Sequence, residues 1–264
     1  MIEGNFVLIL IVILFASALA YRTTFLQKKS IGYFSLLQIL YMVVIPGFLF
    51  PMVFSYLRSV TVRPLSEYRI VGDGVLLNMI LLSILFAYGG VTVHSVTKML
   101  GSRMKPEGEA FEMNRFFHMN FSHNLIYSAV LIAIVGLSLL ELNHVVFEEN
   151  VGIMMAVVRG VALGIGYLIT MYIYSRPQEE YKYNGRWSDL KAVFIVCWSG
   201  FVLMLYAVMK LDPNLKEYHL LLPALSMLAV VSLLGVVLVL KRVKRGGWRV
   251  VVRWDRLFGK ANQG

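Results

Sequence analysis

Residues 151–175 read VGIMMAVVRGVALGIGYLITMYIYS, and Arg159 is the only charged side chain in this run. A hydrophobic run of about 20 residues is long enough to cross the hydrocarbon core of a bilayer as an α-helix. The whole chain has 264 residues, of which 58% are hydrophobic and only 15% are charged, whereas soluble domains have about 25% charged residues. The sequence therefore predicts an all-α integral membrane protein.

Seven hydrophobic runs of roughly this length follow one another along the chain. They cover residues 5–21, 31–57, 74–96, 124–142, 151–175, 190–209 and 219–240. We expect one seven-helix transmembrane domain over residues 1–240, followed by a basic cytoplasmic tail over residues 241–264. The connecting loops are short, so no separate soluble domain is expected.

The lysine and arginine residues predict the orientation. If the N-terminus lies outside, nineteen of the 25 basic residues flank cytoplasmic ends, five flank outer ends, and Arg159 lies within a span. Cytoplasmic loops carry the excess of Lys and Arg in membrane proteins. Cleavage of a signal peptide after Ala20 would invert this distribution, so we expect the first span to be retained. The prediction is a plasma-membrane protein with the N-terminus outside and the C-terminus in the cytoplasm.

An arginine inside the bilayer needs a partner or a function. Arg159 lies eight residues past Val151, about 12 Å from the outer end of its run. One candidate partner is Glu141; another is the set of backbone carbonyls freed by two prolines in the second span, which is expected to be kinked or broken there. The contact is either a structural tie or a binding site for a small polar or anionic solute. The site would contain Arg159, Glu141, Pro46, Pro51, Gly160 and Gly164.

Gly160 and Gly164 are four residues apart in the same run. Small residues at this spacing let a second helix approach closely. Close helix packing is therefore the first interpretation, and a glycine-lined path beside Arg159 is the alternative.

Three histidines lie near the predicted inner boundary: His94, His118 and His123. Histidines can ligate haem or a metal ion. However, His118 and His123 are five residues apart, which turns the second about 140° around a helix, so they share a face only if the helix breaks between them. Cys197 is the only cysteine, which excludes a cysteine-based zinc site. We therefore predict no catalytic residue, no metal site and no cofactor.

Two amphipathic segments are predicted on the cytoplasmic side. Residues 106–121 carry Met113, Phe116, Phe117 and Phe121 on one face, which is typical of a helix lying on the membrane surface. The tail carries a basic stripe beside an apolar one. Contacts with anionic inner-leaflet lipids are expected from Arg249, Arg253, Arg256 and Trp254.

Two main hypotheses for function follow. The first is a membrane protein that binds or translocates a small polar or anionic solute or ion near Arg159. The second is a non-catalytic subunit or scaffold that recruits a protein partner, or a second copy of the chain, through the tail and the inner loop. A metal- or haem-dependent enzyme is a weaker third reading. Nucleic acid is not an expected partner, because the basic residues follow the topology.

Overall fold

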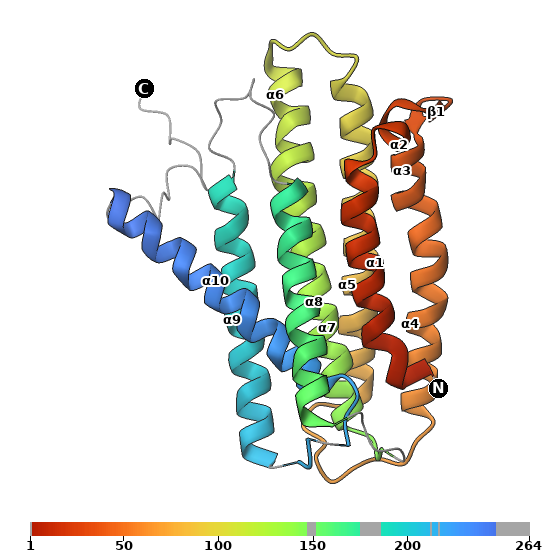
Figure 1. Cartoon of the computed structure of the whole chain (residues 1–264), viewed down its shortest axis with the longest axis vertical. Helices are drawn as coiled ribbons and strands as arrows, with labels where there is room; N and C mark the ends of the chain where they lie inside the picture. The colour runs from red at the N-terminus through yellow and green to blue at the C-terminus, as the bar shows by residue number, and fades with distance from the viewer. Residues whose placement is uncertain (1, 147–151, 175–185, 212, 216, 247–264) are drawn as a thin grey trace.

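The computed structural model of the protein describes residues 2–146, 152–174, 186–211, 213–215 and 217–246. This part of the chain is all-α apart from one small hairpin of two strands, β1 (Ser30–Ile31) and β2 (Phe34–Ser35). Its long helices stand side by side as a bundle, and α10 crosses α8 and α9 at an angle (Figure 1). The predicted fold class, a helical membrane protein, agrees with this architecture.

The predicted hydrophobic runs correspond to the long helices, with ends that differ by a few residues. The helices and the two π-helical turns are α1 (Ile2–Arg22), α2 (Thr24–Lys28), α3 (Leu36–Ile39), η1 (Leu40–Val44), α4 (Ile45–Thr61), α5 (Asp73–Gly101), α6 (Glu109–Phe116), η2 (Phe117–Phe121), α7 (Ser122–Leu142), α8 (Ile153–Tyr174), α9 (Arg186–Leu211) and α10 (Leu221–Gly246).

Five helical stretches in the described chain are long and apolar enough to cross a membrane. They are Gly4–Arg22, Leu36–Thr61, Asp73–Gly101, Glu109–Leu142 and Ile153–Met171. Shorter apolar stretches occur within α9 at Ile195–Leu211 and within α10 at Leu221–Val237. The chain thus has the helices of a multi-pass membrane protein.

The second span is one helical stretch, Leu36–Thr61, so of the kink or break expected at Pro46 and Pro51, the break is wrong. Pro46 lies in the first turn of α4, directly after the π-helical turn η1. A proline is tolerated at the start of a helix, and the π turn changes the hydrogen-bond register just before it. Pro51 lies inside α4 on the exposed side of the bundle. There its missing N–H disturbs no packed neighbour.

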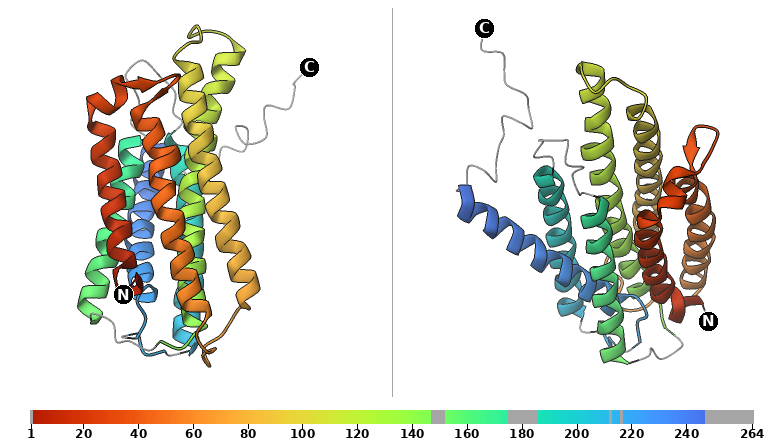
Figure 2. Two further views of the ribbon diagram at one scale, coloured as in Figure 1. Left: turned by 90° about the vertical axis from the view of Figure 1, so that its right-hand side faces the viewer. Right: turned by 45° about the horizontal axis from the view of Figure 1, so that its top comes forward.

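The Phe-rich segment is also placed differently from its prediction. Helix α6 continues through η2 into α7 as one stretch, Glu109–Leu142, instead of lying across the end of the bundle. It runs antiparallel to α5, and the turn between α5 and α6 extends beyond the neighbouring helices (Figures 1 and 2). A side-chain bond holds the two together there, since Asn114 Nδ2 donates to Thr97 O over 3.0 Å. The expected surface helix is therefore an extension of α7.

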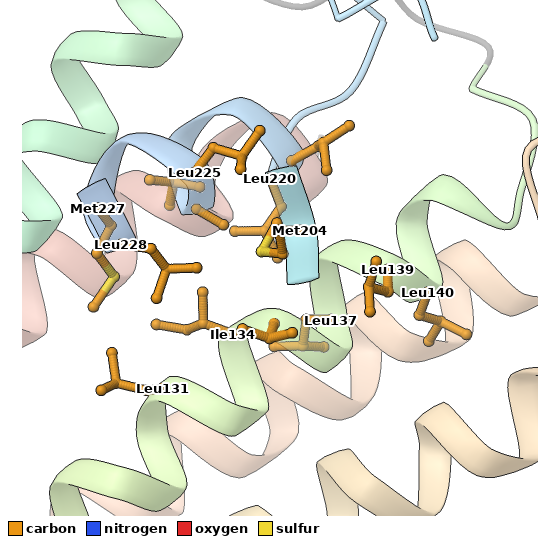
Figure 3. Packing of buried hydrophobic residues seen from close by; sticks show 14 of the residues in the cluster. Leu131, Ile134, Leu137, Leu139, Leu140, Met204, Leu220, Leu225, Met227 and Leu228 are labelled. Carbon is orange, nitrogen blue, oxygen red and sulfur yellow. The ribbon is translucent and has the colours of Figure 1, made fainter. Parts of the chain in front are cut away.

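The core forms where α7 packs against α5, α9 and α10. Gly136 allows α7 to approach α5 closely, because a Cβ at this position would lie 2.8 Å from the side chain of Ile80. On the other side, Leu131 and Ile134 of α7 pack with Met204 of α9 and with leucines of α10 (Figure 3). Helix α7 is consequently the most enclosed helix of the bundle, and polar groups along it are held in defined places.

Candidate functional site

Arg159 is bound to the start of α1. Its Nη1 donates a hydrogen bond to Gly4 O over 2.8 Å, and its side chain is half-buried. Side chains on a helix lean towards its N-terminus, and this lean brings the guanidinium to the end of the bundle where α1 begins. Within the described residues, this partner differs from both partners that the sequence suggested.

Glu141 serves a different helix. Its carboxylate is fully buried and accepts backbone N–H bonds from His219, Leu220 and Leu221, at 2.8, 2.8 and 3.1 Å. These amides precede or begin α10, where the first N–H groups of a helix have no intrahelical acceptor. The acid therefore fastens the end of α7 to the start of α10.

The prolines lie away from Arg159. Phe6 stacks on Tyr56 with ring centroids 4.3 Å apart, so the start of α1 is level with the later turns of α4. Pro46 precedes Tyr56 by ten residues, about 15 Å along the helix. The structure thus separates Arg159 from Pro46, and Pro51 lies on the exposed side of α4. Solute binding by these residues stays a prediction.

Gly160 and Gly164 lie against α10. A Cβ on Gly160 would lie 2.3 Å from Pro223 O, and one on Gly164 would lie 3.2 Å from Met227 O. The space beside each glycine is filled by the backbone of the neighbouring helix. This is the close packing expected from their spacing, and it leaves no glycine-lined path on that face.

Three histidine side chains lie together at the end of the bundle away from Arg159. Three residues form what we call the histidine cluster: His94 of α5, His118 of η2 and His123 of α7. The ring of His94 lies 4.3 Å from the ring of His118 and 4.8 Å from that of His123, measured between centroids. His123 Nε2 and His94 Nδ1 are 3.1 Å apart and share a hydrogen bond.

The π-helical turn η2 explains why the cluster forms. In an α-helix, His118 and His123 would point in different directions. The i→i+5 hydrogen bonds of a π turn instead bring residues five apart onto one side. Both rings consequently face His94, and π turns of this kind occur often at functional sites. The hydrophobic pattern of this segment does not mark a π turn, and the expectation that His118 and His123 lie on different faces is wrong.

The hydrogen bonds around His118 indicate which of its ring nitrogens carries a proton. The hydroxyl of Thr97 donates to Val93 O over 2.6 Å, and His118 Nδ1 lies 3.3 Å from the same hydroxyl oxygen. Since that hydroxyl hydrogen is already used, His118 Nδ1 is the donor. In a neutral His118 the free lone pair is therefore on Nε2, where a proton can be accepted.

One buried ring nitrogen of the histidine cluster has no hydrogen-bond partner among the described residues. It is Nδ1 of His123, whose side chain is 3% exposed. In the described chain, Oδ1 of Asn124, the next residue of α7, is also buried without a hydrogen-bond partner. Buried polar atoms in native proteins nearly always have a partner, so this place is suited to exchanging a proton or binding water.

Metal binding finds no support in the geometry. In the parts of the chain that the structure describes, no group of three or more His, Cys, Asp or Glu side chains is arranged to hold a metal ion. The rings of His94 and His123 are stacked at 29°, an arrangement in which the nitrogens do not converge on one point. The predicted lipid contacts of Arg249, Arg253, Arg256 and Trp254 lie outside the described residues.

The fold and this site indicate a multi-pass helical membrane protein with a histidine cluster at one end of its bundle. Comparison with protein-family models, curated proteins and solved structures finds no match to this chain.

Proposed function

We propose that this protein spans the cell membrane seven times and binds and transfers protons through the histidine cluster. The observation that carries the proposal is the contact of three imidazole rings from α5, η2 and α7, one of them with a buried nitrogen that has no partner among the described residues. Histidine is the side chain whose ordinary charge change falls nearest to neutral pH.

The seven spans and their orientation are part of the proposal. Helices α9 and α10 have 26 residues each, enough to cross a bilayer although only part of each is described in full. The distribution of Lys and Arg favours an outer N-terminus and a cytoplasmic C-terminus. A C-terminal reporter enzyme that is active only in the cytoplasm tests this orientation, and an inactive reporter in well-inserted protein refutes it.

A proton fits the cluster better than a solute does. The rings of His94 and its two neighbours are in contact, so a molecule has no room between them, whereas a proton needs none. The bond between His123 Nε2 and His94 Nδ1 provides a transfer step, because an imidazole that gains a proton on one nitrogen can release one from the other. His118 Nε2 provides a further acceptor.

The proposal replaces the solute site centred on Arg159. That residue is tied to Gly4 O, and the glycines after it are covered by α10. The bond to Gly4 O joins α8 to the start of α1, and the contact of the glycines with α10 is helix packing, so both features are explained without a ligand. The two sites are at opposite ends of the bundle, so variants at each can be tested separately.

The test is proton flux into liposomes that contain the purified protein and a pH-sensitive dye, driven by an imposed potential. Wild type is expected to acidify the lumen faster than empty liposomes, and His94→Gln and His123→Gln are expected to lose most of that flux. His219→Gln removes a histidine at the other end of the bundle and serves as the matched control. Flux equal to that of empty liposomes would refute the proposal, and equal flux in wild type and both cluster variants would refute the role of the cluster.

One observation favours the scaffold hypothesis as a second candidate. The side chains of Met113 and Phe116 on α6 and of Phe117 at the start of η2 are exposed. Exposed apolar groups of this kind mark contact surfaces. Loss of a stoichiometric co-purifying partner in Phe116→Ser, or on deletion of residues 248–264, with the helices still inserted would support this candidate. Wild-type protein that purifies without a stoichiometric partner would refute this candidate.

A further inference from the structure

A second titratable pair lies at the opposite end of α5 and α7. Asp73 is the first residue of α5, and His144 follows the last turn of α7. Asp73 precedes His94 by 21 residues, so the two lie about 31 Å apart along α5. That length equals the hydrocarbon thickness of a bilayer, roughly 30 Å. The pair and the histidine cluster therefore lie one bilayer apart on the same two helices.

Both ring nitrogens of His144 face acceptors. Nδ1 lies 2.9 Å from Arg63 O, and Nε2 lies 3.1 Å from Asp73 Oδ2. A carbonyl oxygen only accepts, so Nδ1 carries a hydrogen, and the bond to Asp73 needs a second proton on either His144 or the carboxyl group. A neutral histidine beside an ionised aspartate has one proton fewer. We propose that Asp73 and His144 form a proton-binding site that holds this additional proton.

The surroundings of the Asp73–His144 site favour exchange of its proton with solvent at this end of the bundle. The side chain of His144 is 3% exposed, whereas that of Asp73 is 26% exposed, so the proton reaches solvent through the carboxylate. Asn143 Nδ2 donates to Asp73 Oδ1 over 2.8 Å, and this bond fixes the orientation of the Asp73 carboxylate. The other charged or titratable side chains on the described segments that meet here are Arg63, Glu67, Tyr68, Arg69, Glu141, Glu217, Tyr218 and His219.

The bound proton joins α5 to α7. When it leaves, the lone pair of Nε2 faces the carboxylate of Asp73, and this hydrogen bond is replaced by repulsion. The preceding loop keeps its other bonds to α7, since Ser66 N donates to Asn143 O over 2.8 Å and Val145 N donates to Pro64 O over 2.9 Å. Proton release therefore removes one of the two side-chain bonds from the end of α7 to Asp73, while the bond from Asn143 and those of the loop remain.

Whether the Asp73–His144 site holds a proton does not depend on proton transport by the protein. That this site forms the outer end of a proton path, however, rests on the proposed function. The test is nitrogen NMR of ¹⁵N-histidine-labelled full-length protein in lipid nanodiscs at about pH 7, where an unperturbed histidine is mostly neutral. The His144 signals are assigned by their loss in His144→Gln. Wild type is expected to show two protonated ring nitrogens on His144, or one nitrogen sharing a proton with Asp73.

Asp73→Asn is the informative variant. Its amide can donate to Nε2, so His144 is expected to become neutral with its proton on Nδ1, while the His219 signals stay unchanged. If this variant does not fold, raising the pH of the wild type is expected to give the same change as the proton leaves. A single, unshared ring proton on His144 of folded wild type at about pH 7 would overturn the inference. The proton flux measured in the His94→Gln and His123→Gln variants does not test the Asp73–His144 site.

Discussion

Replacing Glu141 by alanine is expected to destabilise the protein strongly. The carboxylate is fully buried and accepts three backbone hydrogen bonds at the start of α10. A buried donor left unsatisfied costs about 1–3 kcal/mol, so three amides amount to roughly 3–9 kcal/mol. Removing a desolvated charge recovers part of that. We expect a loss of about 3–5 kcal/mol, the range for removing one partner of a buried pair.

The assay is thermal unfolding of the purified protein in detergent, followed by tryptophan fluorescence. A loss of 1 kcal/mol lowers the midpoint by about 2–4 °C in a protein of this size, so Glu141→Ala is expected to fall by at least about 6 °C. Glu141→Gln keeps one acceptor oxygen and is expected to fall less. Glu107→Gln, an exposed acid between α5 and α6, is the control and should change stability by less than about 0.5 kcal/mol.

The outcome that refutes this reasoning is a midpoint for Glu141→Ala within about 2 °C of wild type, which corresponds to under about 1 kcal/mol. The three amides would then have other acceptors. A fall in Glu141→Gln as large as that in Glu141→Ala would show instead that the negative charge, and not the number of acceptor atoms, stabilises the start of α10.

Three further predictions concern other contacts. Gly160→Ala places a Cβ 2.3 Å from a backbone oxygen of α10 and should lower stability by about 1–3 kcal/mol in the same assay, whereas Gly89→Ala, with nothing within 4 Å, should not. Arg159→Gln loses its bond to Gly4 O and should cost about 1.5–3 kcal/mol but leave proton flux unchanged; lost flux in folded protein would restore the solute site. Burial, and then nearby acids, raise the pKa of Tyr218 above its usual 10.0, so stability should fall as pH rises past about 10, and this fall should be smaller in Tyr218→Phe.

The polar contacts show where prediction from the sequence fails. Arg159 was recognised as a residue in need of a partner, but its partner is a backbone carbonyl 155 positions away. Glu141 was one of its two candidate partners, yet its carboxylate oxygens accept from the amides at the start of α10. Backbone carbonyls and amides are present at every residue, so no residue type marks them in a sequence. Only the packing of α1 and α10 decides which ones come within reach.

Local helix geometry is the second source of error. Pro46 and Pro51 suggested a kink or a break, but the π turn η1 and the first-turn position of Pro46 keep the helix continuous. The π turn η2 has the opposite effect on prediction, because it brings together His118 and His123, which an α-helix would separate. A single inserted residue changes the register of a helix while leaving its hydrophobic pattern almost unchanged.

The sequence by itself determined the class of the protein and the course of its chain. Long apolar runs can lower their free energy only as membrane helices whose backbone bonds are satisfied internally, so composition and spacing suffice to find them. The spacing of Gly160 and Gly164 likewise predicted a close helix contact. The tertiary structure alone decided which polar groups meet: the histidine cluster at one end of α5 and α7, and Asp73 with His144 at the other. Hydrogen bonds act over about 3 Å, and a distance that short between residues far apart in the chain is fixed only when the helices are packed.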